Sequence, residues 1–360
     1  MRVAVDIGPL HGRRTGIGSA VEHTVRALEA RDDVDLAPYL VSYRANPAVG
    51  ELRLPLPAMV ALRLWASGDR PRADRWFRGV DLIHGTNYTV PPTSLPSVVS
   101  VYDCWFLDHD ALASPDVRRS GRVLRRAVDR GAWVHTSSEA TAERVRQLLD
   151  TDRVVSVHLG PLPIDPVPPS TPPSCAHLAG RSFVLAIGTS ERRKRHPWLV
   201  SLASRLPEGH DLVVAGAPGD DAIALAEAHA ALPDRVATRV HVLGPVDTET
   251  KAWLLGAASV LAYPSMDEGF GFPVLEAQAV GVPVVASRVG SIPEVAGDGA
   301  TLVDRDDAEG FAAALERVLT DGSLRSTLVS AGSANLSRFS WESTANGLVA
   351  LYERALGGDS

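Results

Sequence analysis

The sequence predicts an α/β protein built from two parallel sheets, each covered by helices on both faces. Short apolar runs rich in β-branched residues alternate with stretches of helical length along the whole chain. Those runs are almost continuously apolar, as strands buried on both faces are, rather than alternating with polar residues. The 360 residues are also enough for two domains, at roughly 100–200 residues each.

The elements follow from these runs in chain order. In the first half, strand-like runs occupy 3–7, 36–41, 82–84, 97–101, 133–136 and 154–158, and in the second half 183–187, 212–215, 240–243, 260–263 and 284–286. Between them, apolar residues at helical spacing predict helices at 18–30, 140–149, 222–230, 251–256 and 273–280, with a last one at 341–356.

A proline-rich segment marks the expected boundary between two domains. Residues 161–173 contain seven prolines, which favour neither a helix nor a central strand. We therefore predict an N-terminal domain at 1–165, an extended linker at 166–180 and a C-terminal domain at 181–340. The helix in 341–360 is expected to pack back on the N-terminal domain. Open α/β sheets bind ligands at the carboxyl ends of their strands, so we expect the site in a cleft between the two domains.

Composition excludes several classes of protein. A net charge of −7 and an isoelectric point of about 5.9 argue against nucleic-acid binding. Two isolated cysteines, Cys104 and Cys175, form neither a disulfide framework nor a zinc site. The apolar run at the N-terminus is too short for a signal peptide, and no apolar stretch is long enough to span a bilayer. We expect a cytoplasmic protein without a metal site.

The glycine-rich turn after the first strand does not fit a dinucleotide site. That fingerprint needs three glycines spaced G-x-G-x-x-G close behind the strand. Gly16 and Gly18 start the pattern, but Val21 stands at the third position and no acidic residue ends the second strand. The glycine pair before a helix would let a phosphate or a sugar approach backbone N–H groups. A plain loop-to-helix turn is the alternative.

The most informative segment is a strand end, a glycine-interrupted loop and a helix start in direct succession. Proline suits the first helical position, so Pro273 places the helix start near Phe272. The N–H groups of Phe272 and Val274 at that start suit a diphosphate. Glu268 stands in the loop and Glu276 in the first turns of the helix, where ionised carboxylates accept hydrogen bonds from sugar and ribose hydroxyls.

A diphosphate also needs positive charge, and a basic loop supplies it. Arg193 and Lys194 follow the first strand of the second half, at the edge of the sheet where the glutamate segment is also expected. The chain has only two lysines, Lys194 and Lys251, among 36 basic residues, so a lysine is less expected here as filler. A solvated basic loop is the alternative for this pair taken alone.

The order of these motifs resembles that in the retaining glycosyltransferases of family 4, in particular their mannosyltransferase-like group. The resemblance rests on Gly188-Thr189, on Arg193-Lys194 and on the E-x7-E element from Glu268 to Glu276. It extends through 281–287, 292–297 and the closing Phe339-Ser340-Trp341 and, more loosely, to 15–18 and 84–88 in the first half. It covers essentially the whole chain.

The resemblance implies a GT-B fold of two Rossmann-like domains, the first binding the acceptor and the second a nucleotide-sugar donor. It implies transfer of a hexose, with mannose and GDP favoured, to a glycan, lipid-linked or small-molecule acceptor, with retention and without metal or cofactor. Catalytic roles would fall to Glu268, Lys194, Arg193 and Asp103. Donor-binding roles would fall to Gly16, Gly18, Thr189, Val246, Gly269, Phe270, Gly271, Phe272, Val274 and Glu276.

One position departs from the family pattern. Members often have His-Asp where this chain has Tyr102-Asp103, and that histidine would lie near the transferred sugar. Tyrosine can donate a hydrogen bond but is not a cation at neutral pH. His84, Asn87 and Tyr102 are expected on the acceptor side. His84 or His11 would be the substitute histidine, although a structural role is more common for either.

Other interpretations stay open. A nucleotide-sugar epimerase or hydrolase of the same fold, and a non-catalytic nucleotide-sugar binder that regulates a partner, would carry the same donor motifs. Arginines of the helix expected near 118–130, with the arginines and aromatic residues of 62–78, would suit an anionic membrane surface at the inner face of the membrane. A solvated face is the alternative for these arginines.

Overall fold

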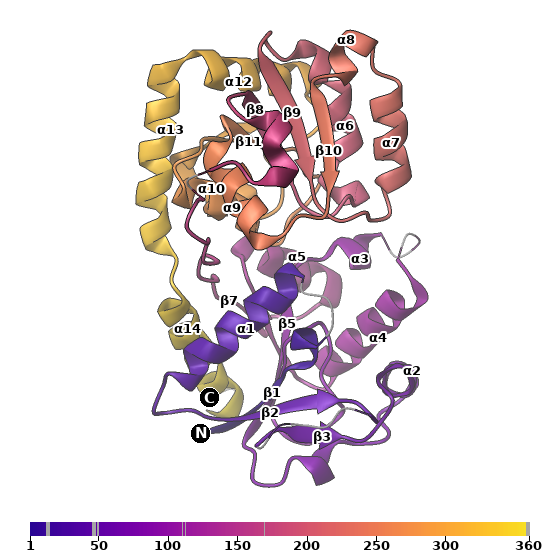
Figure 1. The fold of residues 1–360 in the computed structure, drawn as a ribbon. Helices are drawn as coiled ribbons and strands as arrows, with labels where there is room; N and C mark the ends of the chain where they lie inside the picture. The colour runs from indigo at the N-terminus through magenta and orange to yellow at the C-terminus, as the bar shows by residue number, and fades with distance from the viewer. Residues whose placement is uncertain are drawn as a thin grey trace. The chain divides into compact units, whose positions relative to one another are not determined.

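The structure is a computed structural model that describes residues 1–11, 15–44, 48, 50–109, 111, 113–168 and 170–357. Its internal contacts separate two compact units, Met1–Gly160 with Phe339–Ser360 and Pro161–Arg338. We call them the first unit and the second unit. Each is a parallel sheet covered by helices (Figure 1), which confirms the predicted α/β class.

The first unit holds a seven-stranded parallel sheet in the order β3-β2-β1-β4-β5-β6-β7. Its strands are β1 (Arg2–Asp6), β2 (Asp35–Val41), β3 (Leu52–Leu54), β4 (Leu82–Gly85), β5 (Ser97–Val101), β6 (Trp133–Thr136) and β7 (Val154–Ser156). The winding direction reverses between β1 and β4. Open α/β sheets bind ligands at the carboxyl side of such a switch point.

Helices cover both faces of this sheet because successive strand residues point to opposite sides. Val3 of β1 belongs to one apolar cluster and Ala4 to the other. The Val3 cluster contains α1 (Gly16–Glu29) and α14 (Trp341–Gly357), and the Ala4 cluster contains α2 (Ala58–Ser67), α4 (Pro115–Asp129) and α5 (Glu139–Leu149). A short helix, α3 (Trp105–Asp108), follows β5.

The second unit repeats the arrangement with six parallel strands in the order β10-β9-β8-β11-β12-β13. They are β8 (Ser182–Ile187), β9 (His210–Ala215), β10 (Val240–Gly244), β11 (Val260–Tyr263), β12 (Val284–Ser287) and β13 (Ala300–Val303). Here the switch point lies between β8 and β11. The strand order of both sheets is that of the doubly wound Rossmann fold.

The helices of the second unit also divide between two apolar clusters. One contains α6 (His196–Ser201), α7 (Ala222–Ala230), α8 (Asp234–Ala237), α12 (Ala308–Thr320) and α13 (Gly322–Asn335). The other contains α9 (Thr248–Ala257), α10 (Phe272–Ala279), α11 (Ile292–Ala296) and the 3-10 turn Pro173–Leu178. The sheet is therefore buried on both faces, as its apolar strands require.

The segment expected to be an extended linker belongs to the second unit. The chain leaves the first unit after Gly160 and returns to it at Phe339, so the boundary lies before residue 165. Cys175 and Leu178 are buried in an apolar cluster of the second unit, because prolines restrict the backbone without preventing neighbouring side chains from packing. Helix α14 packs in the first unit. No helix in the described ranges is long and apolar enough to cross a membrane.

Candidate functional site

The candidate site of the second unit lies at the switch point between β8 and β11. The turn Arg192–Lys194 follows β8, and the loop with Glu268 follows β11, at the carboxyl ends of two neighbouring strands. A backbone bond from Met266 N–H to the Arg193 carbonyl, 2.7 Å, ties the two connections together. The sequence placed both motifs at one edge of one sheet, and the structure brings them into contact.

Glu268 is held between two cations. Arg193 Nη1 donates to Glu268 Oε2 at 2.6 Å, and Lys194 Nζ donates to Glu268 Oε1 at 2.6 Å. The Ser265 hydroxyl donates to the same Oε1 at 2.6 Å. Glu268 is only 5% exposed, so these are charge-assisted hydrogen bonds inside the protein, which are stronger than neutral ones.

Burial and charge act on these groups in opposite directions. Burial alone would raise the pKa of Glu268, but Arg193 and Lys194 outweigh it and lower the pKa to about 2. Burial lowers the pKa of Lys194, and Glu268 acts against that shift. The carboxylate is therefore ionised across the physiological range. The buried part of the cluster has two cations and one anion, and the partly exposed Glu191 also contacts Arg193, at 3.3 Å.

Backbone contacts fix Glu268 and its loop. Ser291 N–H donates to the Glu268 carbonyl at 3.0 Å.

Lys194 Nζ also donates to the Tyr263 hydroxyl at 2.7 Å and lies 4.8 Å from the centre of that ring. Ser265 and Tyr263, at the end of β11, were not singled out in the sequence as functional residues. Their position beside Glu268 was the only signal, since serine and tyrosine are common at strand ends.

The amide-rich turn leads into α10. Gly271 has φ +94°, a left-handed backbone conformation that favours glycine, and a Cβ there would also lie 2.7 Å from Ile292 Cδ1. Phe272 starts the helix as expected. The Val274 N–H donates to the Gly271 carbonyl at 3.0 Å, so this predicted phosphate donor is engaged within the turn. Phe270 is buried and packs edge-on against Phe272.

Glu276 has a partner that sequence reasoning missed. Lys251 Nζ of α9 donates to Glu276 Oε1 at 2.5 Å, and Glu276 is 2% exposed. The two residues lie 25 positions apart in sequence, so no local pattern connects them. Each of the two lysines of the chain thus contacts a different glutamate of the E-x7-E element: Lys194 contacts Glu268, and Lys251 contacts Glu276.

The remaining second-unit predictions lie around the same switch point. Thr189 follows Gly188. The aliphatic part of the Lys194 side chain lies beside Gly188, where a Cβ added to the glycine would be 3.7 Å from Lys194 Cε. A Cβ at Gly216 would collide with the Gly188 carbonyl at 1.8 Å, so the connections after β8 and β9 approach closely. Val246, between β10 and α9, is half-buried against the apolar cluster of α9 and α10.

In the first unit, the glycine pair starts α1. Thr15 caps this helix, its hydroxyl accepting from the Gly18 N–H at 3.2 Å. A Cβ at Gly18 would lie 2.9 Å from the Pro9 carbonyl, whereas Gly16 has open space around it. The Gly18 amide is therefore engaged in a helix cap. Residues 12–14 of this turn lie outside the described residues.

The acceptor-side predictions receive different environments. His84 is buried, and its ring nitrogens are engaged by Tyr352 and Ser100, the structural role that is the alternative to an acceptor contact. Asn87 is half-buried in the connection after β4. Asp103 Oδ1 accepts from the Trp105 N–H at 3.2 Å, at the start of α3.

Tyr102 and Asp6 lie at the carboxyl ends of β5 and β1, and the charge of Asp6 acts on Tyr102. Burial raises the pKa of Tyr102, with a smaller contribution from Asp6. Burial also raises the pKa of Asp6 to about 6, against the hydrogen bond from the Gly8 N–H. The Tyr39 hydroxyl, buried and on the strand position paired with Asp6, has no hydrogen-bond partner among the described residues. Sequence reasoning did not single out Asp6 or Tyr39.

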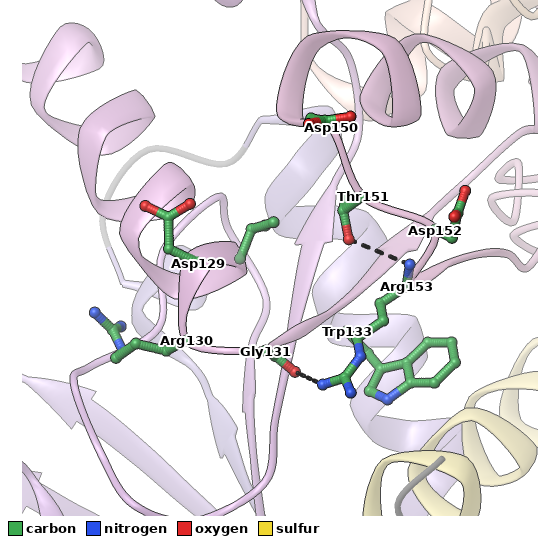
Figure 2. Close-up of a pocket in the computed structure, with 9 residues that line it drawn as sticks. Asp129, Arg130, Gly131, Trp133, Asp150, Thr151, Asp152 and Arg153 are labelled. Carbon is green, nitrogen blue, oxygen red and sulfur yellow. Dashed lines mark hydrogen bonds between the residues drawn. The ribbon is translucent and has the colours of Figure 1, made fainter. Parts of the chain in front are cut away.

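A hollow on the first unit lies at the opposite edge of its sheet. Figure 2 shows it lined by Asp129, Arg130, Trp133, Asp150 and Arg153, at the amino ends of β6 and β7. The Arg153 guanidinium donates to the Gly131 carbonyl at 2.9 Å. None of the predicted site residues lines this hollow. Across the described ranges, no group of three His, Cys, Asp or Glu side chains is arranged to hold a metal ion.

Comparisons with known proteins agree with this geometry. A family described as Glycosyl transferases group 1 matches residues 181–321, which contain the whole second-unit site. The O-antigen chain mannosyltransferase B of Escherichia coli is 31% identical over 288 residues, covering 76% of this chain and 74% of that protein. The chain belongs to the group 1 glycosyltransferases. It is therefore a glycosyltransferase.

Further relatives of this glycosyltransferase are matched over shorter stretches. The D-inositol 3-phosphate glycosyltransferase of Mycobacterium marinum is 34% identical over 180 residues, 48% of this chain and 38% of that protein. The chain thus spans well under two thirds of the length of that relative.

Solved structures show the GT-B fold. Sucrose-phosphate synthase from Thermosynechococcus elongatus is similar with a TM-score of 0.71 at 20% identity, over 98% of both chains. The Anabaena protein HepE, solved in complex with UDP-glucose, is similar with a TM-score of 0.69 at 16% identity, over 98% of this chain and 99% of that one. The two Rossmann-like units of this chain accordingly have the GT-B fold.

Proposed function

We propose that this protein is a retaining, metal-independent glycosyltransferase of family 4 that transfers a hexose, with mannose favoured, from a nucleoside-diphosphate sugar to an acceptor hydroxyl. The observation that carries the proposal is the cluster of Arg193, Lys194 and Glu268 at the second switch point. The name of the Escherichia coli relative, a mannosyltransferase, supports the choice of sugar. The GDP-linked sugar is the favoured donor, with the UDP-linked sugar as the alternative.

Arg193 and Lys194 would compensate the negative charge of the donor diphosphate. Glu268 accepts one hydrogen bond from Arg193 and one from Lys194. Lysine carries three N–H donors and arginine five, so each can bind phosphate oxygens and still retain a contact with Glu268. Positive charge held in place before the reaction stabilises the departing diphosphate electrostatically, the role that a metal ion plays in other transferases.

The two glutamates would bind the two sugars of the donor. Glu268, ionised and held by its neighbours, accepts hydrogen bonds from hydroxyls of the transferred hexose. Glu276, fixed by Lys251, accepts from the ribose hydroxyls. The Phe270–Phe272 turn supplies backbone groups to hexose and phosphate. Front-face substitution then proceeds through an oxocarbenium-like transition state, with a diphosphate oxygen as base for the acceptor hydroxyl.

Ligand binding and product analysis test the proposal. Since a ligand that binds only the folded state raises its stability, GDP, UDP and ADP should be compared by thermal shift, with GDP expected to give the largest increase. Transfer from GDP-mannose should continue in EDTA and give a product whose anomeric configuration matches the donor. Loss of activity in EDTA, or an inverted product, would contradict the proposal.

The same reaction separates the alternatives. An epimerase or a hydrolase would convert the nucleotide sugar without any acceptor, whereas a transferase should require one for full turnover. A non-catalytic binder would show the thermal shift with no product under either condition. The intact set of Lys194, Glu268 and Glu276 favours an enzyme.

We further propose that the first unit contacts an anionic membrane surface through helix α2, at the inner face of the membrane. The described residues contain nine exposed large apolar side chains, and three of them, Met59, Val60 and Leu64, lie on this ten-residue helix. They share its outer face with exposed Arg63. Arg70 and Arg122, on the segment after α2 and on the adjacent α4, are also exposed, and apolar and cationic groups together suit anionic lipid.

Vesicle flotation tests this contact. The protein should float with vesicles containing phosphatidylglycerol at low salt and detach at high salt, and Leu64→Glu should abolish flotation. Ile223→Glu is the matched control, because Ile223 is 77% exposed in the second unit and should not affect flotation. Equal flotation of both variants and the wild type would contradict the proposal.

A further inference from the structure

Lys194 is held by a second group besides Glu268. Its Nζ donates to Glu268 Oε1 at 2.6 Å and to the Tyr263 hydroxyl at 2.7 Å. The Lys194 side chain is 13% exposed and Tyr263 is 2% exposed, so both contacts lie inside the protein. Two buried acceptors on one ammonium group indicate that its position is set by the fold.

The tyrosine is itself fixed by the turns around it. Tyr263 ends β11 and belongs to the apolar cluster of α9, α10 and α11. A Cβ added at Gly271 would lie 3.9 Å from Tyr263 Cε1, so the ring lies beside the turn that leads into α10. Ser265, two residues further on, donates to the same Glu268 oxygen that Lys194 contacts. The end of β11 therefore supports both Lys194 and Glu268.

The two contacts leave Lys194 one N–H group. A lysine ammonium carries three N–H donors and no acceptor. Glu268 and Tyr263 take two of them, and no third acceptor contacts Nζ in the part of the chain that the structure describes. One contact alone would let the ammonium swing about it. Two contacts, together with the bond to Cε, fix the direction in which the third N–H points.

Tyr263 differs from Glu268 in charge. A carboxylate holds the ammonium but also cancels its positive charge, whereas a tyrosine hydroxyl accepts a hydrogen bond without carrying a charge. Burial and the charge of Glu268 raise the pKa of Tyr263 well above its usual value, so the hydroxyl stays neutral. Tyr263 therefore fixes Lys194 and leaves its charge available to an anion. A packing role alone would need only the ring.

We propose that Tyr263 is a positioning residue that directs one N–H of Lys194 to the β-phosphate of the donor. The phosphate next to the transferred hexose is the one expected there, because Lys194 also contacts Glu268, the residue proposed to bind that hexose. The inference rests on the proposed glycosyltransferase function. It adds a residue that acts on the leaving group through Lys194 alone.

Nuclear magnetic resonance tests the contact without any ligand. The chain contains only two lysines, so ¹H–¹³C spectra of protein labelled with ¹³C-lysine should show two Cε signals, which Lys251→Arg assigns. Tyr263→Phe keeps the ring and removes the hydroxyl. It should shift the Lys194 signal and leave the Lys251 signal in place. A Lys194 signal that does not move would overturn the contact and the inference with it.

Nucleotide affinity tests the role of the contact. The ratio of the GDP affinity to the GMP affinity measures what the β-phosphate contributes, and calorimetry gives it without an acceptor; UDP and UMP serve in the same way. Tyr263→Phe should lower this ratio about tenfold, the low end for a hydrogen bond to a charged group, and leave the GMP affinity unchanged. Tyr39→Phe is the matched control, because it removes a buried hydroxyl that has no partner among the described residues.

A double-mutant cycle separates positioning from packing. Since Tyr263 is proposed to act through Lys194, Tyr263→Phe should cause no further loss of the GDP-to-GMP ratio in a Lys194→Ala background. Transfer from GDP-mannose to methyl α-mannoside, as a probe acceptor, should show the same dependence in kcat. Losses that multiply in the double variant would mean that Tyr263 acts independently of Lys194 and would overturn the inference.

Failure of the proposed function gives a different result. A wild type that binds no nucleoside diphosphate contradicts the proposed function, and with it any role of Tyr263 in binding phosphate. A wild type that binds GDP or UDP, with an affinity ratio that Tyr263→Phe leaves unchanged, contradicts the role of Tyr263 alone.

Discussion

The two sheets have the same strand order, but the buried side chains at their carboxyl edges differ in charge. In the second unit, buried charges meet at the switch point, with Glu268 between Arg193 and Lys194. In the first unit, the buried groups are neutral, as in the series from Tyr352 through His84 to His135. The two sheets therefore share one topology, and the residues that follow each strand give their carboxyl edges different chemistry.

The difference fits two kinds of ligand. A diphosphate carries full negative charge, and only fixed cations compensate for its desolvation. A sugar acceptor is neutral, and its hydroxyls are distinguished by the direction of each hydrogen bond rather than by charge.

The largest effect is expected from Glu268→Gln. Removing one partner of a buried ion pair destabilises a protein by about 3–5 kcal/mol. Since the pKa of Glu268 is lowered to about 2, its stabilising contribution is present above about pH 4.5 and is lost as the pH falls toward 2. Urea denaturation at pH 7 should show the loss, and GDP or UDP should stabilise the variant more than the wild type because a diphosphate replaces the missing anion.

Glu191→Gln is the matched control. Glu191 contacts Arg193 at 3.3 Å but its side chain is 43% exposed, so its loss should change the free energy of unfolding by less than about 1 kcal/mol. An equal loss in both variants would mean that burial does not distinguish the two glutamates.

The two lysines test the charged edge next. A hydrogen bond from a charged group is worth about 1.5–3 kcal/mol, so Lys194→Ala should reduce turnover with the nucleotide sugar tenfold to hundredfold. Lys251→Ala should raise the KM for the donor and leave kcat less affected, because Lys251 binds Glu276, the residue proposed to contact the ribose. Arg192→Ala, which changes an exposed neighbour, should leave both constants unchanged. Unchanged kinetics in Lys194→Ala would refute its contact with phosphate.

Asp6 is the exception on the neutral edge. Its pKa is raised to about 6 by burial, so the folded state binds its proton more tightly than the unfolded state does. Stability from this group is present below about pH 3.8 and is lost as the pH rises through 6. Asp6→Asn should therefore stabilise the protein by about 3 kcal/mol at pH 8 and by little at pH 4. Thermal unfolding at both pH values measures this, with exposed Asp35→Asn as control.

The smallest loss of stability is expected from removing a helix cap, a feature that both units share. Thr15 caps α1 in the first unit, and Asp247 caps α9 in the second by accepting from the Thr250 N–H at 2.8 Å. Replacing either residue with alanine should cost about 1 kcal/mol. Chemical denaturation of both variants checks this, and a much larger loss for Thr15→Ala would indicate that the start of α1 does more than begin a helix.

The sequence predicted the central strands and one edge strand of each sheet, β7 and β10, but it missed the opposite edge strands, β3 and β13, and the helices α2, α12 and α13. Central strands such as β8 and β11 are continuous apolar runs, because helices cover both of their faces. Strand β3 has only three residues, and β13 is half-buried along most of its length, so neither gives such a run. The predicted bounds of the other elements agree with the structure to within three residues at either end.

The site shows the same division between local and distant information. Arg193, Lys194 and Glu268 were identified because each lies in a recognisable local motif, and the parallel strand order brings them together. The contacts of Lys251 with Glu276 and of Tyr352 with His84 join residues 25 and 268 positions apart. No local pattern encodes such pairs, and a buried histidine looks the same in sequence whether it contacts a substrate or a neighbouring tyrosine.

The return of the chain to its starting unit constrains how such proteins can be recombined. Helix α14 supplies Leu348 and Tyr352 to the interior of the first unit, although it is encoded at the far end of the sequence. Exchanging the first unit between relatives would require transplanting residues 1–160 together with residues 339–357. A graft of the amino-terminal segment alone would expose an apolar face of its sheet to water and would remove the Tyr352 hydroxyl that contacts His84.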